Sequence, residues 1–387
     1  MDLLPVLPNS LMRISRLKLH NFRNHTNTEV EAAPGLNLIT GPNGAGKTNL
    51  IDAIHYLCMS RSFVTVSDVY IAHQEHKYFM AEGRFHGKVR SDFTIGCSYS
   101  RGEGKKLFVN KSPLERFSDL IGLVPVVVLS PSDAKLTSDG PAERRSFLDS
   151  LISQTSTPYL RDLIDYRKIR RQRNRLFQEF RGPDSQLRDL LEPWDRNLVT
   201  KGAAIIRKRA EVLERFSRYL ELQYRTISGL DLHPSLKYVT LTDQLGSSEE
   251  IEAEFQNQLT NNFGKEAERE QTLIGPHRDE VLFYLGEMEL RKYGSQGQHR
   301  LFSMALKMAQ LFYYLDELDD LPILLLDDIF GNLDPQKAKA ITETVRKHAG
   351  QTFITAAADL PLDKKELFSG DENRWFQVNN SIVTVRN

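Results

Sequence analysis

Residues 41–48, GPNGAGKT, constrain this chain more than any other stretch, because they match every position of the pattern G-x-x-x-x-G-K-[ST]. An apolar run, LNLIT (36–40), precedes the loop, and a helical pattern, KTNLIDAIHYLCM (47–59), follows it. Glycines let such a loop wrap tightly, so that successive backbone N–H groups and the positive end of the next helix face an anion. The pattern therefore predicts a strand–loop–helix unit that holds the phosphates of a nucleotide.

The residues of this predicted phosphate cradle have separate expected roles. We expect the Lys47 ammonium to reach the β- and γ-phosphates, and the Thr48 hydroxyl to bind Mg²⁺. The alternative is a glycine-rich turn that carries a lysine by chance. The full set of expected nucleotide contacts in this loop is Gly41, Pro42, Asn43, Gly44, Ala45, Gly46, Lys47 and Thr48.

A second motif is the stretch LPILLLDDIFGNLD (321–334), in which an apolar run ends in two adjacent acids, Asp327 and Asp328. In nucleotide-binding proteins with this kind of loop, the acid that ends such a strand holds the magnesium ion, which assigns Asp327 to the metal. Asp328 is placed to orient or deprotonate an attacking water. Acids also commonly end strands without such a role. Asp334 and Pro335 resemble a helix cap and first-turn proline, with an added interface role left open.

The stretch YGSQGQHR (293–300) places small and polar residues in front of a helical run. We expect Ser295 to cap a helix that begins near Gly297, where free N–H groups form a second anion site. The stretch resembles the signature loop of ABC-type ATPases, Leu-Ser-Gly-Gly-Gln, which closes over the nucleotide of a second subunit. A plain capped helix is the alternative. The residues expected to act on the partner's nucleotide are Ser295, Gly297 and Gln298.

Composition restricts the class of protein. The chain has 387 residues, 40% hydrophobic and 26% charged, and its 51 basic and 51 acidic side chains balance. Nucleic-acid binding would therefore come from local patches. No apolar run approaches the roughly 18–20 residues of a membrane helix. Cys58 and Cys97 fit no metal-binding spacing, and a reducing cytoplasm is the expected location.

Alternating and helical patterns divide the chain. Strand-like runs occupy 13–40, 78–85, 92–99, 106–109, 124–131, 279–285, 322–328, 352–358 and 381–385. Ile206, Leu213 and Leu220 recur every seven residues and predict a helical hairpin. Pro183 and Pro193 are expected to interrupt that run. The expected domains are an N-terminal extension at 1–12, an α/β domain at 13–152 and 271–387, and a helical insertion at 153–270.

Five ordered segments resemble the RecF family of bacterial recombination-mediator ATPases, from about Met12 onward. They are LKLHNFRNH (17–25), SRSFVT (60–65), LSPSDAKLTSDGPAERRSFLD (129–149), LIGPHRDEVLFYL (273–285) and YGSQGQHR (293–300). The resemblance implies an ABC-type P-loop head with a mixed sheet and flanking helices, interrupted by a helical arm like a short SMC hairpin.

The same resemblance implies a function. It implies binding of ATP and Mg²⁺, ATP-dependent homodimerisation on duplex or gapped DNA, and weak DNA-stimulated hydrolysis in which Lys47 and Asp328 are catalytic. The implied partners are RecR with RecO, and indirectly RecA, during gap repair and the SOS response. The protein would act in the cytoplasm near the nucleoid, without a membrane partner.

Departures from the wider ABC-type pattern leave two rivals open. Asp328 stands where most ABC-type ATPases have glutamate, which keeps a non-hydrolysing DNA-bridging scaffold in view. An energy subunit for a transporter predicts Leu-Ser-Gly-Gly-Gln and a switch histidine after the strand TFIT, and the sequence has neither. Thr355 is the expected stand-in for that histidine.

Basic residues offer candidate DNA contacts. Seven Lys or Arg lie within 161–175, and Lys201 and 207–209 add charge. They could neutralise phosphates, or form an ordinary solvated helix face. Arg144 and Arg145 are equally open to a DNA contact, a dimer contact or an exposed first helical turn. His277 and its neighbours receive no role.

Overall fold

The computed structural model describes residues 12–73, 75–88, 90–242, 246–357, 368 and 370–386, and these divide into two compact units. The first unit comprises the chain up to Asp133, Thr226–Gly229, and Ser303 onward. The second comprises Ala134–Arg225 and Leu230–Phe302. Among the helices in these described ranges, none is long and apolar enough to cross a membrane.

One sheet of the first unit holds the strands that surround the predicted cradle. In order across the sheet they are β15 (Ile382–Arg386), β14 (Arg374–Asn379), β3 (Leu36–Thr40), β13 (Thr352–Ala356), β12 (Ile323–Asp327) and β8 (Val126–Leu129). From β14 to β8 the pairing is parallel, and β15 returns antiparallel along β14. Every residue of β12 and β13 is buried, as expected for parallel strands covered on both faces.

The other sheet of the first unit is antiparallel. In order across it lie β2 (His25–Glu31), β1 (Arg13–Phe22), β4 (Tyr78–His86), β5 (Phe93–Ser100), β6 (Gly104–Val109) and β7 (Ser112–Pro113). Burial alternates along β4, so one face of this sheet packs on the core and the other meets solvent.

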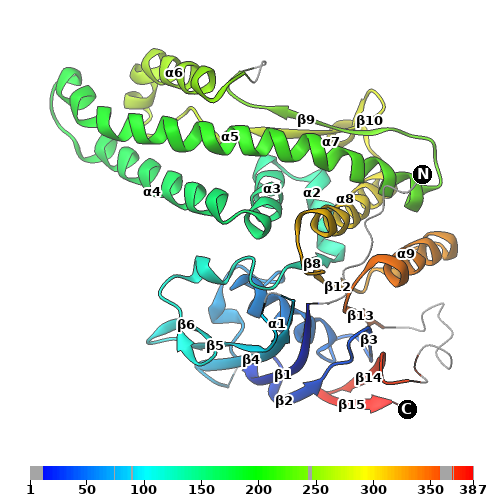
Figure 1. Cartoon of the computed structure of the whole chain (residues 1–387). Helices are drawn as coiled ribbons and strands as arrows, with labels where there is room; N and C mark the ends of the chain where they lie inside the picture. Colours follow the sequence, from blue (N-terminus) through cyan, green and yellow to red (C-terminus); the bar gives the residue numbers. More distant parts are fainter. Residues whose placement is uncertain are drawn as a thin grey trace. The chain divides into compact units, whose positions relative to one another are not determined.

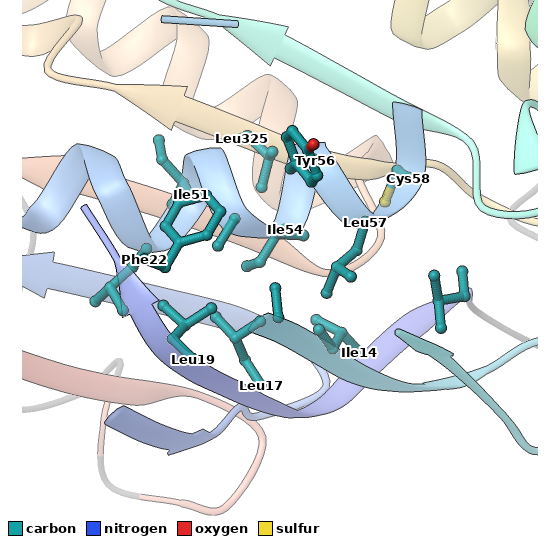
Figure 2. Packing of buried hydrophobic residues seen from close by; sticks show 14 of the residues in the cluster. Ile14, Leu17, Leu19, Phe22, Ile51, Ile54, Tyr56, Leu57, Cys58 and Leu325 are labelled. Atoms are coloured by element: carbon teal, nitrogen blue, oxygen red, sulfur yellow. The ribbon is translucent and has the colours of Figure 1, made fainter. Parts of the chain in front are cut away.

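Helix α1 (Lys47–Met59) packs between these sheets (Figures 1 and 2). The close-up shows Ile54 and Leu57 of α1 facing Leu17 of β1, with Leu325 of β12 on the other side of the helix. All four side chains are fully or almost fully buried. A helix enclosed on two sides in this way fixes the position of the loop that precedes it, since burial of each such side chain contributes roughly 1.5–3 kcal/mol.

Shorter elements complete the first unit. The other helix wholly within it is α9 (Pro335–His348), and α8 (Gln296–Glu317) begins in the second unit and ends in the first. One-turn 3-10 helices lie at Asp68–Tyr70, Phe117–Leu120, Pro131–Ala134 and Phe330–Asn332.

The second unit is mainly helical. Its elements are α2 (Lys135–Ser138), α3 (Pro141–Thr155), α4 (Thr157–Glu179), α5 (Asp184–Ser228), α6 (Ser248–Glu268) and α7 (Leu290–Tyr293), with a small antiparallel sheet of β9 (Pro234–Val239), β10 (Glu280–Leu285) and β11 (Met288–Glu289). The end of α5, from Thr226, belongs to the first unit. Helices α4 and α5 run side by side as the predicted hairpin (Figure 1), joined by an ion pair of 2.5 Å between Arg173 and Asp195.

The predicted elements are largely confirmed. Residues 47–59 form α1, and the run at 13–40 divides into β1, β2 and β3. Pro193 does not interrupt the helical run: it lies inside α5, where the buried Leu191 and Leu198 hold the helix by packing despite the missing N–H. Strand β14 was not predicted. The expected insertion, 153–270, falls mostly within the second unit, and its limits as a functional domain stay a prediction.

Candidate nucleotide-binding site

The predicted cradle is a tight loop between the end of β3 and the start of α1. Its three glycines, Gly41, Gly44 and Gly46, have positive φ angles of 155°, 79° and 109°. A Cβ on Gly41 would lie 2.1 Å from the Val378 carbonyl oxygen of β14, and one on Gly46 would lie 2.8 Å from the Asn24 amide. No side chain caps the N-terminus of α1, so its first N–H groups remain open to an anion.

Lys47 folds back over this loop. Its Nζ donates to the carbonyl oxygens of Gly41 at 2.7 Å and Pro42 at 2.8 Å, and the residue is 7% exposed. Burial lowers the pKa of the Lys47 ammonium, while the charges of Asp328 and Asp327 act to raise it. A buried cation satisfied only by carbonyls can exchange them for stronger, charge-assisted bonds to phosphate oxygens.

The cradle and the acidic motif, 279 residues apart in the chain, meet at Thr48. Its Oγ1 donates to Asp327 Oδ1 at 2.8 Å. Strand β13 lies between β3 and β12 in the sheet, so the Thr48–Asp327 hydrogen bond joins residues that follow β3 and end β12, two strands that are not neighbours. Burial raises the pKa of the Asp327 carboxyl, opposed by hydrogen bonds from Thr355 and Thr48, and the charge of Asp328 raises it further. The structure therefore brings Thr48 and Asp327 together, as the sequence predicts.

Thr355 organises both acids from the neighbouring strand. Its hydroxyl donates to Asp327 Oδ1 at 2.7 Å and accepts the backbone N–H of Asp328 at 3.0 Å. Asp328 has a φ of 47°, a left-handed conformation that is uncommon for a residue other than glycine. Thr355 itself is fully buried. It is thus a positioning residue for the acids; its substitution for a switch histidine stays a prediction.

Two residues that contact the loop or the helix after it, His25 and Asn24, were not identified from the sequence as part of the site. His25 is buried, with Nε2 3.1 Å from the Gly46 carbonyl oxygen and Nδ1 3.0 Å from Thr28 Oγ1. Burial lowers the pKa of His25, so the neutral ring donates to Gly46 and accepts from Thr28. The Asn24 amide oxygen accepts from Asn49 at 2.6 Å. These residues lie in LKLHNFRNH, whose position before the cradle was the available signal.

The signature-like loop lies in the second unit. Ser295 Oγ accepts the N–H of Gln298 at 3.3 Å, and Gln298 Oε1 accepts the N–H of Ser295 at 2.8 Å. This reciprocal arrangement is a capping box, so the predicted cap is confirmed and α8 begins at Gln296. Ser295 and Gly297 are exposed. The action of Ser295, Gly297 and Gln298 on a partner's nucleotide stays a prediction.

The helix after the acidic motif begins as predicted. Asp334 Oδ1 accepts the N–H of Lys337 at 3.0 Å, and Pro335 occupies the first turn of α9. The capping role is confirmed, and an added interface role stays a prediction.

Three arginines proposed as surface charges are buried instead. Arg144 forms a two-bond pair with Glu280 at 2.8 and 3.1 Å. Arg173 bonds Asp195 and Glu266, and Arg209 bonds Asp149 and Asp279. Each arginine is at most 2% exposed, because only paired carboxylates make burial of a guanidinium tolerable. They stabilise the second unit and cannot contact DNA directly.

Known proteins resemble this sequence over most of its length. Residues 13–370 match the family of RecF, RecN and SMC N-terminal domains. The DNA replication and repair protein RecF of Salinibacter ruber is 42% identical over 357 residues, 91% of this chain and 86% of that protein. RecF of Halothermothrix orenii is 35% identical over 378 residues, covering 96% of this chain and 99% of that protein.

Solved structures share the fold. The recombination mediator protein RecF-ATP of the RecFOR pathway superposes with a TM-score of 0.88 and 29% identity, over 97% of this chain and 98% of that one. An Smc head domain from Pyrococcus furiosus, bound to the C-terminal domain of ScpA, has a TM-score of 0.54 and 14% identity, a likeness of fold alone. The predicted ABC/SMC-like head with a helical insertion is confirmed, and the chain belongs to the RecF family.

Proposed function

We propose that this chain is an ATP-dependent DNA-binding protein that acts as a recombination mediator. Each nucleotide site would combine the cradle and Asp327 of one protomer with Ser295, Gly297 and Gln298 of a second. The observation that carries the proposal is the Thr48–Asp327 hydrogen bond, which joins the two halves of a phosphate and metal site at the end of α1. A relative of this family has been solved with ATP.

The residues present fit a magnesium ion shared with the nucleotide. Magnesium prefers oxygen ligands and usually binds proteins through one or two carboxylates, with phosphate and water oxygens completing the shell. Thr48 and Asp327 supply a hydroxyl and a carboxylate, and the described residues contain no cluster of three or more His, Cys, Asp or Glu that would form a complete cage. When bound, the ion would neutralise charge on the phosphates.

Hydrolysis requires little from the protein beyond position and charge. Water attacks the γ-phosphorus, the bond from that phosphorus to the β–γ bridging oxygen breaks, and ADP leaves. Asp328 orients the water and accepts its proton. Lys47 and the N–H groups at the start of α1 stabilise the negative charge on the phosphate oxygens.

ATP would act as a timer for a DNA clamp. Binding the γ-phosphate from both protomers favours a homodimer on duplex or gapped DNA, and hydrolysis removes that bridge and releases the clamp. RecO and RecR are the expected partners in loading RecA, since a solved relative belongs to the RecFOR pathway. The proposed site of action is the cytoplasm, where the chromosome lies.

A matched pair of variants tests the shared site. Ser295→Arg removes the cap of α8 and places a bulky cation on the exposed loop. Ser247→Arg removes an equivalent capping box, with Glu250, at the start of α6 in the same unit. Light scattering should show ATP-driven dimers for Ser247→Arg and none for Ser295→Arg, while both bind ATP. Normal dimers of Ser295→Arg would refute the shared site.

The shorter carboxylate at Asp328 favours a second candidate function, a scaffold that binds ATP but turns it over only negligibly. DNA-stimulated phosphate release separates the two. An active timer predicts release that Asp328→Ala abolishes; equal release from wild type and variant would support the scaffold.

A further inference from the structure

A basic cavity in the second unit is unexplained by the nucleotide site. It has a volume of about 240 Å³, and α3, α4, α5 and the turn at Pro276–His277 form its walls. Two of the family-like segments, PAERRSFLD and GPHRD, meet here although they lie far apart in the chain. The charged residues that line it are Arg145, Arg167, Arg170, Arg209 and Asp149.

The carboxylates of Asp149 and Asp279, near the cavity, already form ion pairs with arginines. Asp149 binds Arg209 at 2.7 Å and Arg167 at 3.0 Å, and Asp279 binds Arg209 at 3.0 Å. By contrast, no ion pair within the described part of the chain joins Arg145 or Arg170 to a carboxylate. The cavity therefore carries an excess of positive charge.

Arg145 and Arg170 are partly buried, and burial disfavours the charged form of each guanidinium group. Arg145 is half-buried and donates to the Asp279 carbonyl oxygen at 2.7 Å. Burial and the neighbouring charge of Arg209 lower its pKa, opposed by the charges of Glu280, Asp279 and Asp149. Burial also lowers the pKa of Arg170; Tyr166 opposes this shift, and the charge of Arg167 adds to it. Both guanidinium groups would be stabilised by an anion between them.

The floor of the cavity is neutral and fixed. His277 Nε2 lies 3.1 Å from the Thr272 carbonyl oxygen, so this nitrogen donates, and Nδ1 accepts the hydroxyl of Tyr166 at 2.7 Å. Burial lowers the pKa of His277 to about 3. Because the ring stays uncharged, it sets the shape of the cavity while the arginines supply its charge.

Exposed cations continue from the cavity along α4. Arg167 and Arg171 are four residues apart and share a helix face, with Lys168 beside them, and all three are exposed. A row of cations that leads from a recessed arginine cluster suits a polyanion with repeating charge better than a single small anion. Guanidinium groups also match phosphate oxygens in two-bond geometry.

We propose that this cavity receives a backbone phosphate of the DNA strand, with Arg145 and Arg170 as its ligands. The assignment rests on the proposed function, since it locates DNA binding on the second unit. It also explains why the turn at Pro276–His277 is braced by the buried Asp149–Arg209–Asp279 cluster, since a recessed phosphate site needs rigid walls.

The test compares two double variants with the same change in charge. Arg145→Gln with Arg170→Gln removes the two proposed ligands. Arg196→Gln with Arg225→Gln removes two exposed arginines of α5 that pair with Glu192 and Glu221. Fluorescence anisotropy with a gapped duplex in ATP, at several salt concentrations, measures affinity and its salt dependence. Circular dichroism and ATP binding confirm that each variant is folded.

The cavity variant should bind DNA at least about tenfold more weakly than wild type. Its slope of log affinity against log salt should become shallower by about 0.9 for each phosphate that the protein no longer neutralises. The control should match wild type. If wild type binds DNA and the cavity variant binds equally well with the same slope, the cavity assignment is wrong and the proposed function survives. If wild type binds no DNA, both fall.

A second arm distinguishes a strand from a free anion. Inorganic pyrophosphate should compete weakly with DNA for wild type and have less effect on the cavity variant. Calorimetric binding of pyrophosphate that is absent in the cavity variant, together with unchanged DNA affinity, would identify a small-anion site and overturn the proposal.

Discussion

Replacing Thr355 by valine tests whether one buried hydroxyl organises Asp327 and Asp328. Valine has nearly the same shape as threonine but cannot donate to Asp327 Oδ1 or accept the N–H of Asp328. Since Thr355 is fully buried, water cannot replace either bond. The variant therefore removes two hydrogen bonds with little change in packing.

The cost follows from these two hydrogen bonds. A hydrogen bond to a charged group contributes roughly 1.5–3 kcal/mol, and one between neutral groups contributes about 1 kcal/mol. The Asp328 N–H also lies 3.2 Å from the Thr355 carbonyl oxygen and keeps that partner. We therefore expect the free energy of unfolding to fall by about 2–4 kcal/mol. A misaligned Asp327 should also weaken magnesium-dependent ATP binding by roughly 10–100-fold.

Thr355→Ser is the matched control, because it keeps the hydroxyl and removes only a methyl group, at a cost of about 1 kcal/mol. Chemical unfolding and ATP titration with and without Mg²⁺ measure both effects. Valine should be clearly worse than serine in both assays. If valine equals or exceeds serine in stability and in magnesium-dependent affinity, Thr355 does not organise the acids.

Three further predictions concern the cradle and its acid. Gly46→Ala should abolish ATP binding, because its Cβ would meet Asn24 and His25 and its φ of 109° disfavours side chains; equilibrium dialysis with labelled ATP measures this, and near-normal affinity would contradict it. Lys47→Ala should reduce ATP affinity by at least about tenfold in the same assay, because charge-assisted hydrogen bonds to the phosphates are removed. Unchanged affinity would show that Lys47 does not contact the phosphates. Asp327→Asn should raise the thermal midpoint of the nucleotide-free protein while removing magnesium-dependent affinity. The pKa of Asp327 is raised in the folded state, so its stabilising contribution is present below the unfolded pKa and is lost as pH rises through the folded pKa. The increase in thermal midpoint caused by Asp327→Asn should thus appear at pH values above the folded pKa of Asp327 and vanish at low pH. An increase that does not depend on pH would contradict a raised pKa of Asp327.

Local patterns predicted the elements that carry the cradle and its acids. The span of α1 was predicted correctly because its loop and helix patterns adjoin each other, and Asp327 was placed at a strand end because an apolar run stops there. The insertion of β13 between β3 and β12 was not predicted, since strand order depends on contacts between distant segments. Strand β14, whose carbonyl at Val378 makes glycine necessary at position 41, was missed for the same reason.

Charge was readable from the sequence, but its burial was not. Arg144, Arg173 and Arg209 looked like surface cations because arginine is usually exposed, and their partners lie 22 to 136 residues away. The cavity that Arg145 and His277 both line was not predicted either, because these two residues lie far apart in the sequence. The sequence indicates Thr355 only as a substitute for a histidine, because nothing local to it predicts hydrogen bonds to both Asp327 and Asp328.

The central claim is that the γ-phosphate of ATP joins two protomers through the cradle of one and the Ser295 loop of the other. Sedimentation velocity on the wild-type chain with Mg²⁺, in the presence of no nucleotide, ADP, ATP or a non-hydrolysable analogue, tests it most directly. A nucleotide site shared in this way predicts a monomer without nucleotide and with ADP, and a dimer of about twice the 44.3 kDa chain mass with ATP or the analogue. A sedimentation coefficient that is the same in all four conditions would contradict it.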